Sequence, residues 1–181
     1  MAQAYGAGRR LESIFFGGGT PSLMPAWLVE GIIADADRLF GFAPDIEITA
    51  EANPTSADAE TFTKFRAAGV NRLSLGVQSL RDEALAFLGR EHSAREAVAA
   101  LRTAKQTFDR LSIDLIYARQ DQQLADWTEE LQMALDLGLN HMSLYQLTIE
   151  PGTGFHSRAR QGDILTADDG LAADMYAETN R

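Results

Sequence analysis

The run Gly17-Gly18-Gly19-Thr20, followed by Pro21, is the first stretch of the sequence that could bind a ligand. Successive glycines let the backbone approach a ligand closely and leave amide N–H groups available to an anion. Thr20 adds a hydroxyl group. The run lacks the Gly-Lys-Ser/Thr of a Walker A loop and the spacing of a GxGxxG loop. Taken alone, it is compatible with a ligand site and also with a tight turn that binds nothing.

Two polar side chains stand where other predicted strands end. Glu51 precedes Asn53-Pro54. A carboxylate in such a place can accept hydrogen bonds from ribose hydroxyls. Gln78 follows Gly76, which allows close approach, and its amide could bind a carboxylate or a ribose group. The competing interpretations are a solvated acid or helix cap at Glu51 and an ordinary surface amide at Gln78.

Two charged residues also stand out. Arg90 lies at a predicted helix break, where its guanidinium is suited to bidentate carboxylate binding. A surface ion pair with Glu83 or Glu91, which would contribute little to stability, is the alternative. Asp114 is surrounded by apolar residues inside a predicted strand, and a charge there is costly unless it is paired or bound to a ligand. Asp114 is the strongest single-residue signal, although a buried arginine partner would also explain it.

Several other chemistries are excluded or disfavoured. The chain has no cysteine, so it contains no disulfide, no zinc–thiolate site and no cysteine-ligated iron–sulfur cluster. The three histidines, His92, His141 and His156, are too scattered to predict a metal site. No GxSxG motif of a serine hydrolase is present.

The elements that must position these residues alternate between strand and helix. Short β-branched or alternating runs predict strands at 12–16, 45–50, 71–77, 111–117 and 141–149. Helical spacing follows each run, including a region from 82 to 105 broken near 90–93 and a C-terminal stretch over 167–181. Repeated βα units imply a parallel sheet. Polar residues at the ends of five strands favour a partial barrel over an open doubly wound sheet, so we predict an α/β partial barrel.

The bulk properties fit one globular domain spanning residues 1–181. The chain has 181 residues, 45% of them hydrophobic, and a net charge of −10 without a basic stripe. Nucleic-acid binding is therefore not expected. No apolar run is long enough for a membrane-spanning helix, and the first ten residues do not resemble a signal peptide, so a cytoplasmic location is the default expectation.

Read in order, the motifs match one family. They are IFFGGGTPS (14–22), EITAEANP (47–54), RLSLGVQS (72–79), LGREH (88–92), IDLIY (113–117) and LYQLTIEPGT (144–153). Together they resemble the radical S-adenosylmethionine (SAM) proteins of the oxygen-independent coproporphyrinogen III oxidase family. The last motif is more similar to the heme chaperone branch, the HemW type, than to the oxidase. The resemblance covers nearly the whole chain.

The resemblance implies a partial (β/α)6 barrel that binds SAM at the carboxyl ends of its strands. By this likeness Gly18, Gly19 and Thr20 contact the methionine end of SAM. Four further side chains match SAM-binding positions of the family, and one residue matches a backbone contact near the adenine. The four are Glu51, Gln78, Arg90 and Asp114, and the backbone contact is Thr148.

Three departures from the family pattern matter. The CxxxCxxC loop that holds the [4Fe–4S] cluster is absent, along with the first strand, and Met1 would fall partway through the first helix. Ala118-Arg119-Gln120 replaces the common Gly-Leu-Pro. The chain also stops before the C-terminal region where the chaperone branch carries heme-binding residues. We therefore expect a truncated gene model or a degenerate copy that cannot cleave SAM as written, and a marginally stable one, because a missing first strand exposes a sheet edge.

The resemblance implies that an intact member binds a [4Fe–4S] cluster, SAM and heme, and passes heme to an acceptor that the sequence does not identify. The alternative within the family is the oxidative decarboxylase that acts on coproporphyrinogen III. Two alternatives from other classes are a SAM- or nucleotide-binding scaffold without catalysis, and a phosphate-binding (β/α) enzyme that uses Gly17–Thr20. Whether the chain is an enzyme is left open at this point.

Overall fold

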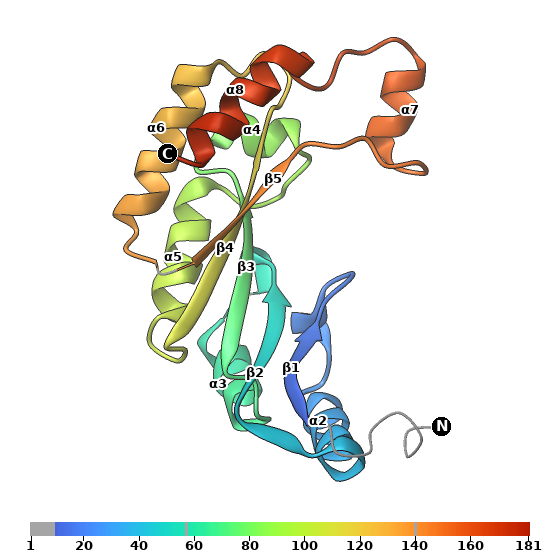
Figure 1. The fold of residues 1–181 in the computed structure, drawn as a ribbon, viewed down its shortest axis with the longest axis vertical. Coiled ribbons are helices and arrows are strands. Elements are labelled where there is room, and N and C mark those ends of the chain that lie inside the picture. Colours follow the sequence, from blue (N-terminus) through green and yellow to red (C-terminus); the bar gives the residue numbers. More distant parts are fainter. Residues whose placement is uncertain (1–9, 57, 140) are drawn as a thin grey trace. The chain divides into compact units, whose positions relative to one another are not determined.

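The structure is a computed structural model that describes residues 10–56, 58–139 and 141–181. Figure 1 shows strands alternating with helices along the chain. The strands are β1 (Leu11–Phe16), β2 (Phe42–Ala52), β3 (Arg72–Gln78), β4 (Arg110–Tyr117) and β5 (His141–Gln146). The α-helices are α2 (Ala26–Phe40), α3 (Ala59–Ala67), α4 (Asp82–Phe87), α5 (Ala94–Ala104), α6 (Leu124–Asp136), α7 (Gly154–Arg160) and α8 (Asp169–Thr179). Short 3-10 turns, η1 (Pro21–Leu23) and η2 (Pro54–Ser56), follow β1 and β2.

The five strands form one sheet in the order β1-β2-β3-β4-β5, which is also their order along the chain. β1 pairs with β2 in parallel, with a register shift between Leu11 and Ser13, and β2 pairs with β3 in parallel. Parallel neighbours joined by helices place successive strand ends at the same edge of a sheet. The predicted alternation of strands and helices is thus confirmed.

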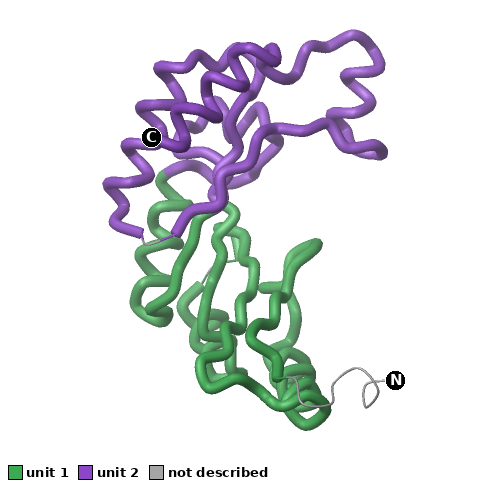
Figure 2. The backbone as a smooth tube through the Cα atoms, viewed as in Figure 1, with its two compact units in different colours: residues 1–76, 95–113 green, residues 77–94, 114–181 purple. Residues whose placement is uncertain are grey.

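The chain divides into two compact units, drawn in different colours in Figure 2. Unit 1 comprises residues 1–76 and 95–113, and unit 2 comprises residues 77–94 and 114–181. The predicted position of Met1 within a first helix lies outside the described residues.

The core of unit 1 lies between its strands and helices. Phe62 on α3 packs edge-on against Phe108, with ring centroids 6.0 Å apart. Asp58 caps α3 because its side chain accepts a hydrogen bond from the Thr61 amide. Helix α2 buries Val29 and Ile33. Three other apolar residues of α2 are at least one third exposed, so they lie off its core face; they are Leu28, Ile32 and Leu39.

Unit 2 has its own core around Trp127 on α6. The Trp127 ring stacks on Tyr117 at the end of β4, with centroids 5.0 Å apart. Its indole N–H donates to Thr179 Oγ1 on α8 at 2.8 Å, so α6 and α8 are joined by a polar as well as an apolar contact. Met175 of α8 is fully buried.

Most element boundaries agree with the sequence predictions. The predicted break in the region 82–105 is confirmed, since α4 ends at Phe87 and α5 begins at Ala94. β5 ends at Gln146, so the prediction of a strand up to Ile149 was too long. Helix α7 was not predicted. No helix among the described residues is both long and apolar enough to cross a membrane.

Candidate functional site

The glycine loop after β1 adopts a conformation that only glycine accepts easily. Gly18 and Gly19 have φ angles of +84° and +63°, and an added Cβ at either position would meet no atom within 4 Å. The Gly18 amide donates a hydrogen bond to Glu51 Oε2 at the end of β2, at 3.1 Å. The structure therefore brings together two parts of the predicted site, the glycine run and Glu51.

Gly17 is needed for a different reason, because its neighbours leave little space. A Cβ at Gly17 would lie 2.6 Å from a ring atom of Phe15 and 3.3 Å from Glu51 Oε1. Beyond the loop, Ser22 Oγ lies 2.7 Å from Ser56 Oγ, so the segments after β1 and β2 are linked a second time. Thr20 precedes η1, and its side chain makes no capping hydrogen bond. Its hydroxyl thus has no structural task as a cap.

Gln78 ends β3 in unit 2 with a φ of +68°, an unusual value for a residue that is not glycine. Its side chain is half-buried, and its amide makes no hydrogen bond with any residue that the structure describes. A ligand group could therefore bind this amide without displacing a protein partner.

Arg90 is half-buried between α4 and α5, and burial lowers the pKa of its guanidinium. Its Nε is buried and finds no hydrogen-bond partner among the described residues. Arg90 forms no salt bridge with Glu83 or Glu91 in the described structure, so the alternative of a surface ion pair is wrong. A buried N–H group without a hydrogen-bond partner is costly, and more so on a charged guanidinium. A bound carboxylate would remove that cost.

Asp114 and Thr148 are the remaining predicted residues of unit 2. Asp114 is half-buried rather than buried, while the next residue, Leu115, is fully buried on the other side of the strand. Asp114 has an interaction partner, so it is not an isolated charge. Thr148 lies just after β5 with an exposed side chain, whose Oγ1 donates to Glu150 at 3.3 Å. Whether the predicted residues of both units serve one SAM site stays a prediction.

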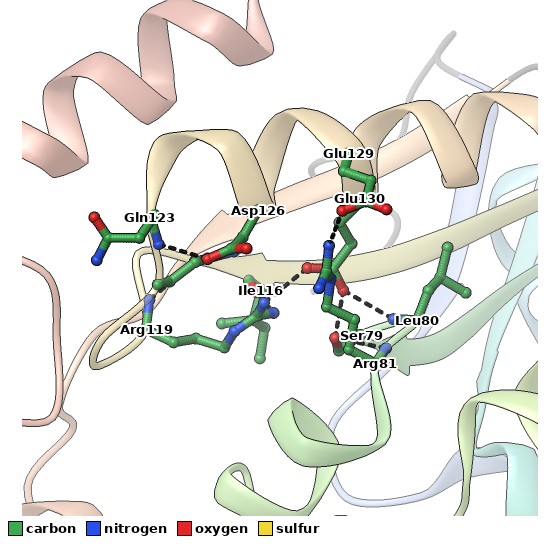
Figure 3. A network of polar contacts seen from close by, with 10 residues as sticks. Ser79, Leu80, Arg81, Ile116, Arg119, Gln123, Asp126, Glu129 and Glu130 are labelled. Atoms are coloured by element: carbon green, nitrogen blue, oxygen red, sulfur yellow. Dashed lines mark hydrogen bonds and ion pairs between the residues drawn. The ribbon is translucent and has the colours of Figure 1, made fainter.

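The sequence prediction missed a buried polar network in unit 2, drawn in Figure 3. Glu130 of α6 is fully buried and its carboxylate pairs with Arg119 at 2.7 Å, a residue only 5% exposed at its side chain. The same carboxylate accepts hydrogen bonds from Ser79 Oγ and from the Leu80 amide. Arg119 also donates to the Ile116 carbonyl at 2.7 Å. The only sequence signal was the departure Ala118-Arg119-Gln120 from the family loop, because Glu130 reads as an ordinary surface residue of a helix.

Unit 2 also contains a cavity of about 370 Å³. It is lined by side chains of both charges and by one aromatic ring: Arg81, Glu83, Ala84, Phe87, Arg119, Gln120, Asp121, Gln122 and Asp126. None of the predicted SAM-binding residues lines it. The mixed lining does not favour one class of ligand.

The residues present fit SAM better than they fit a cluster. Arg90 offers a cation for a carboxylate, and the glycine loop has open space at Gly18 and Gly19. By contrast, the chain has no cysteine, and the described residues contain no group of three or more histidine, aspartate or glutamate side chains that could hold a metal ion. The described residues therefore do not provide the ligands of a [4Fe–4S] cluster.

Comparison with protein families decides the assignment. Residues 1–143 match the model of the radical SAM superfamily. The chain belongs to the radical SAM superfamily. It is similar to radical S-adenosyl methionine domain-containing protein 1 of Bos taurus, named as mitochondrial, with 46% identity over 94% of this chain and 39% of that protein. It is also 41% identical to the heme chaperone HemW of Escherichia coli, over 93% of this chain and 44% of that protein.

Two solved structures have a similar fold. The coproporphyrinogen III oxidase HemN of E. coli, a radical SAM enzyme, superposes with a TM-score of 0.78 at 27% identity, over 98% of this chain and 41% of that one. The archaeal Elp3 of Methanocaldococcus infernus shares the fold, with a TM-score of 0.80 at 16% identity, over 97% of this chain and 46% of that one. The predicted fold class, an α/β partial barrel of parallel strands, is confirmed. The chain spans about 40% of the length of the curated relatives that it matches.

Proposed function

We propose that residues 1–181 are a partial radical SAM core domain of a heme chaperone-like protein and contribute its SAM-binding residues. The observation that supports this most is the 41% identity to the E. coli heme chaperone over 93% of the chain. Identity to the E. coli coproporphyrinogen III oxidase is lower, at 27%. Oxidative decarboxylation of coproporphyrinogen III is therefore the second candidate.

In this proposal each predicted residue has a task set by its chemistry. Arg90 binds the carboxylate of SAM and so satisfies its buried guanidinium. Glu51 accepts hydrogen bonds from the ribose hydroxyls, while Gln78 and Asp114 bind further polar groups of SAM. Gly18, Gly19 and Thr20 face its methionine end, and the Thr148 backbone lies near the adenine; the family resemblance supports these positions.

The proposal assigns no radical chemistry to these residues by themselves. Bound SAM would supply the radical chemistry, which is the cofactor's own and would need a cluster as its electron donor. This chain has no cysteine to hold such a cluster. We therefore propose that the chain as written is inactive in SAM cleavage, and that the [4Fe–4S] cluster belongs to intact members of the family.

The proposed partners are a heme or porphyrin and an unidentified heme acceptor of the intact protein. Two of the similar proteins are named heme chaperones of bacteria, which supports a heme-related partner. We propose a cytoplasmic location. The mammalian relatives carry "mitochondrial" in their names, so a mitochondrial location is the alternative that localisation of a tagged chain would detect.

Titration with SAM tests the proposal. Without a cluster to bind its amino and carboxylate groups, SAM should bind weakly, with a dissociation constant on the order of millimolar. At saturating SAM we expect amide shifts in NMR spectra at Gly18 and Gly19 and around Arg90. Arg90→Gln should abolish the shifts, whereas the matched variant Arg95→Gln, at an exposed position of α5, should leave them unchanged.

Calorimetry tests the two alternatives, the non-catalytic scaffold and the phosphate site. Sub-micromolar binding of SAM in the absence of iron would favour the non-catalytic scaffold. Inorganic phosphate serves as the second titrant, for the alternative of a phosphate site at Gly17–Thr20. We expect no phosphate binding, because the Glu51 carboxylate already accepts a hydrogen bond from the Gly18 amide and would repel an anion at the glycine loop.

A further inference from the structure

Gln78 lies at the centre of a strained turn. The Ser79 amide donates to the Val77 carbonyl at 2.9 Å, which closes a three-residue γ-turn around Gln78 and its φ of +68°. This conformation is sparsely populated for a residue with a side chain. Such a conformation persists only where its surroundings fix it, and it is common at ligand-binding positions.

On one side, the turn is fixed by Glu130. This fully buried carboxylate of α6 accepts from Ser79 Oγ and, at 2.8 Å, from the Leu80 amide, as Figure 3 shows. Its other oxygen binds Arg119, so the carboxylate is itself held in place. The two residues that follow Gln78 are thus anchored by a side chain that is distant in sequence.

On the other side, the turn is fixed by His92. The His92 side chain is 4% exposed, and its Nε2 lies 3.0 Å from the Val77 carbonyl oxygen. Because a carbonyl only accepts, Nε2 must carry the proton and donate it. The second ring nitrogen, Nδ1, is buried without a partner among the described residues, so the contact with Val77 is the one polar bond described for this ring.

The backbone of the turn and the side chain of Gln78 differ in how they are held. The backbone is held from both sides, while the Gln78 amide itself makes no hydrogen bond with the described residues. Forming a strained turn around a side chain that has no structural partner gives the fold no evident benefit. Presenting the Gln78 amide to a ligand would be such a benefit.

We propose that His92 and Glu130 are positioning residues that hold the Gln78 turn at positive φ, so that its carboxamide is fixed in one direction for a polar group of the ligand. The identity of that ligand as SAM rests on the proposed function. The geometry of the turn does not, and the two can be tested separately.

The first experiment measures amide hydrogen exchange of Ser79 and Leu80 in the 181-residue chain. His92→Leu removes the donor to Val77, and Ser79→Ala removes one donor to Glu130 without altering a buried charge. Each should raise the exchange rates by about tenfold or more, through easier local opening. His92→Gln keeps an N–H at similar reach and should restore rates to within about threefold of the parent. His141→Leu, at an exposed histidine of the same unit, should change nothing.

A double variant separates positioning of Gln78 from ordinary packing of His92. Glycine adopts positive φ without strain. In a Gln78→Gly background, the turn should therefore stay in place, and His92→Leu should raise exchange by less than about threefold. An equal increase in both backgrounds would mean that His92 only packs, and it would overturn the proposal.

The second experiment follows the Gln78 side-chain NH₂ signals during SAM titration. They should shift in the parent and in His92→Gln, and not in His92→Leu. Equal shifts in parent and His92→Leu would overturn the positioning role. If the exchange results are as expected but SAM moves no Gln78 signal in the parent, the positioning role stands and the assignment of SAM to Gln78 fails.

Discussion

The loop after β1 in unit 1 and the loops after β3 and β4 in unit 2 adopt positive φ angles in different ways. In unit 1 the glycine loop uses Gly18 and Gly19, which tolerate such angles without strain. In unit 2 the loops after β3 and β4 use Gln78, Ala118 and Asp121, at φ angles of 68°, 58° and 59°. The loops after β3 and β4 must therefore stabilise by contacts what the glycine loop after β1 obtains from residue type.

The contacts that hold these loops differ in the same way. In unit 1 the loop hydrogen bond from Gly18 to Glu51 is exposed. In unit 2 the loops are fixed by the buried carboxylate of Glu130, paired with the nearly buried Arg119. A loop formed by glycine should survive loss of its partner, whereas a loop held by buried charge should not. Substitution of a buried and an exposed charge, and of a loop and a helix glycine, tests this contrast.

Arg119→Met should be the most destabilising of these substitutions. It leaves the Glu130 carboxylate buried and without its cation, and breaking such a buried pair costs about 3–5 kcal/mol. Urea denaturation followed by circular dichroism measures the change in the free energy of unfolding.

Arg38→Met is the matched control in unit 1. Arg38 pairs with Asp35 at 2.8 Å, but their side chains are 67% and 69% exposed. The expected cost is below about 1 kcal/mol. Similar losses of unfolding free energy in both variants would show that burial does not make the Arg119–Glu130 pair more important for stability than an exposed pair.

The same difference explains which features could be predicted from sequence. The glycine run 17–19 predicts a turn from residue type alone, and the short apolar runs predict the order of the strands. Glu130 could not be found, because a glutamate on a helix normally points to solvent and its burial depends on Ser79 and Arg119, far apart in sequence. The unusual angle of Gln78 was hidden for the same reason: nothing in a Gln-Ser pair indicates positive φ.

Gly19→Ala should have an intermediate effect. Its φ of +63° disfavours any side chain, although an added Cβ would meet no atom within 4 Å. The loss should therefore come from backbone strain alone, at about 1–2 kcal/mol. Thermal unfolding of the purified variant measures it.

Gly31→Ala is the same substitution in a helical setting of the same unit. Gly31 lies within α2 with open space around it, and alanine in a helix interior should add about 0.5–1 kcal/mol of stability. Opposite signs at positions 19 and 31 would confirm that glycine forms the loop by its conformational freedom. A neutral result at position 19 would mean that the loop relaxes to another conformation.

The smallest effect concerns Glu47, the partly exposed counterpart of Glu130 in unit 1. A hydrogen bond from Arg72, at 2.8 Å, lowers the pKa of the Glu47 carboxyl. A lowered folded-state pKa contributes stability that is complete above the unfolded-state value and is lost as the pH falls through the folded-state value. Because the Glu47 side chain is 35% exposed, solvent screening should keep the contribution below about 1 kcal/mol.

Glu47→Gln should accordingly destabilise the chain slightly at about pH 7, and by less at an acidic pH below the lowered folded-state pKa, where the carboxyl is protonated in both states. Urea midpoints of parent and variant at the two pH values measure this, with Glu30→Gln on the exposed face of α2 as the control that should show no such difference. A loss that persists at low pH would mean that Glu47 acts through packing rather than charge. The contrast with Glu130 would then lie in how tightly each side chain is packed, and not in how far each charge is removed from water.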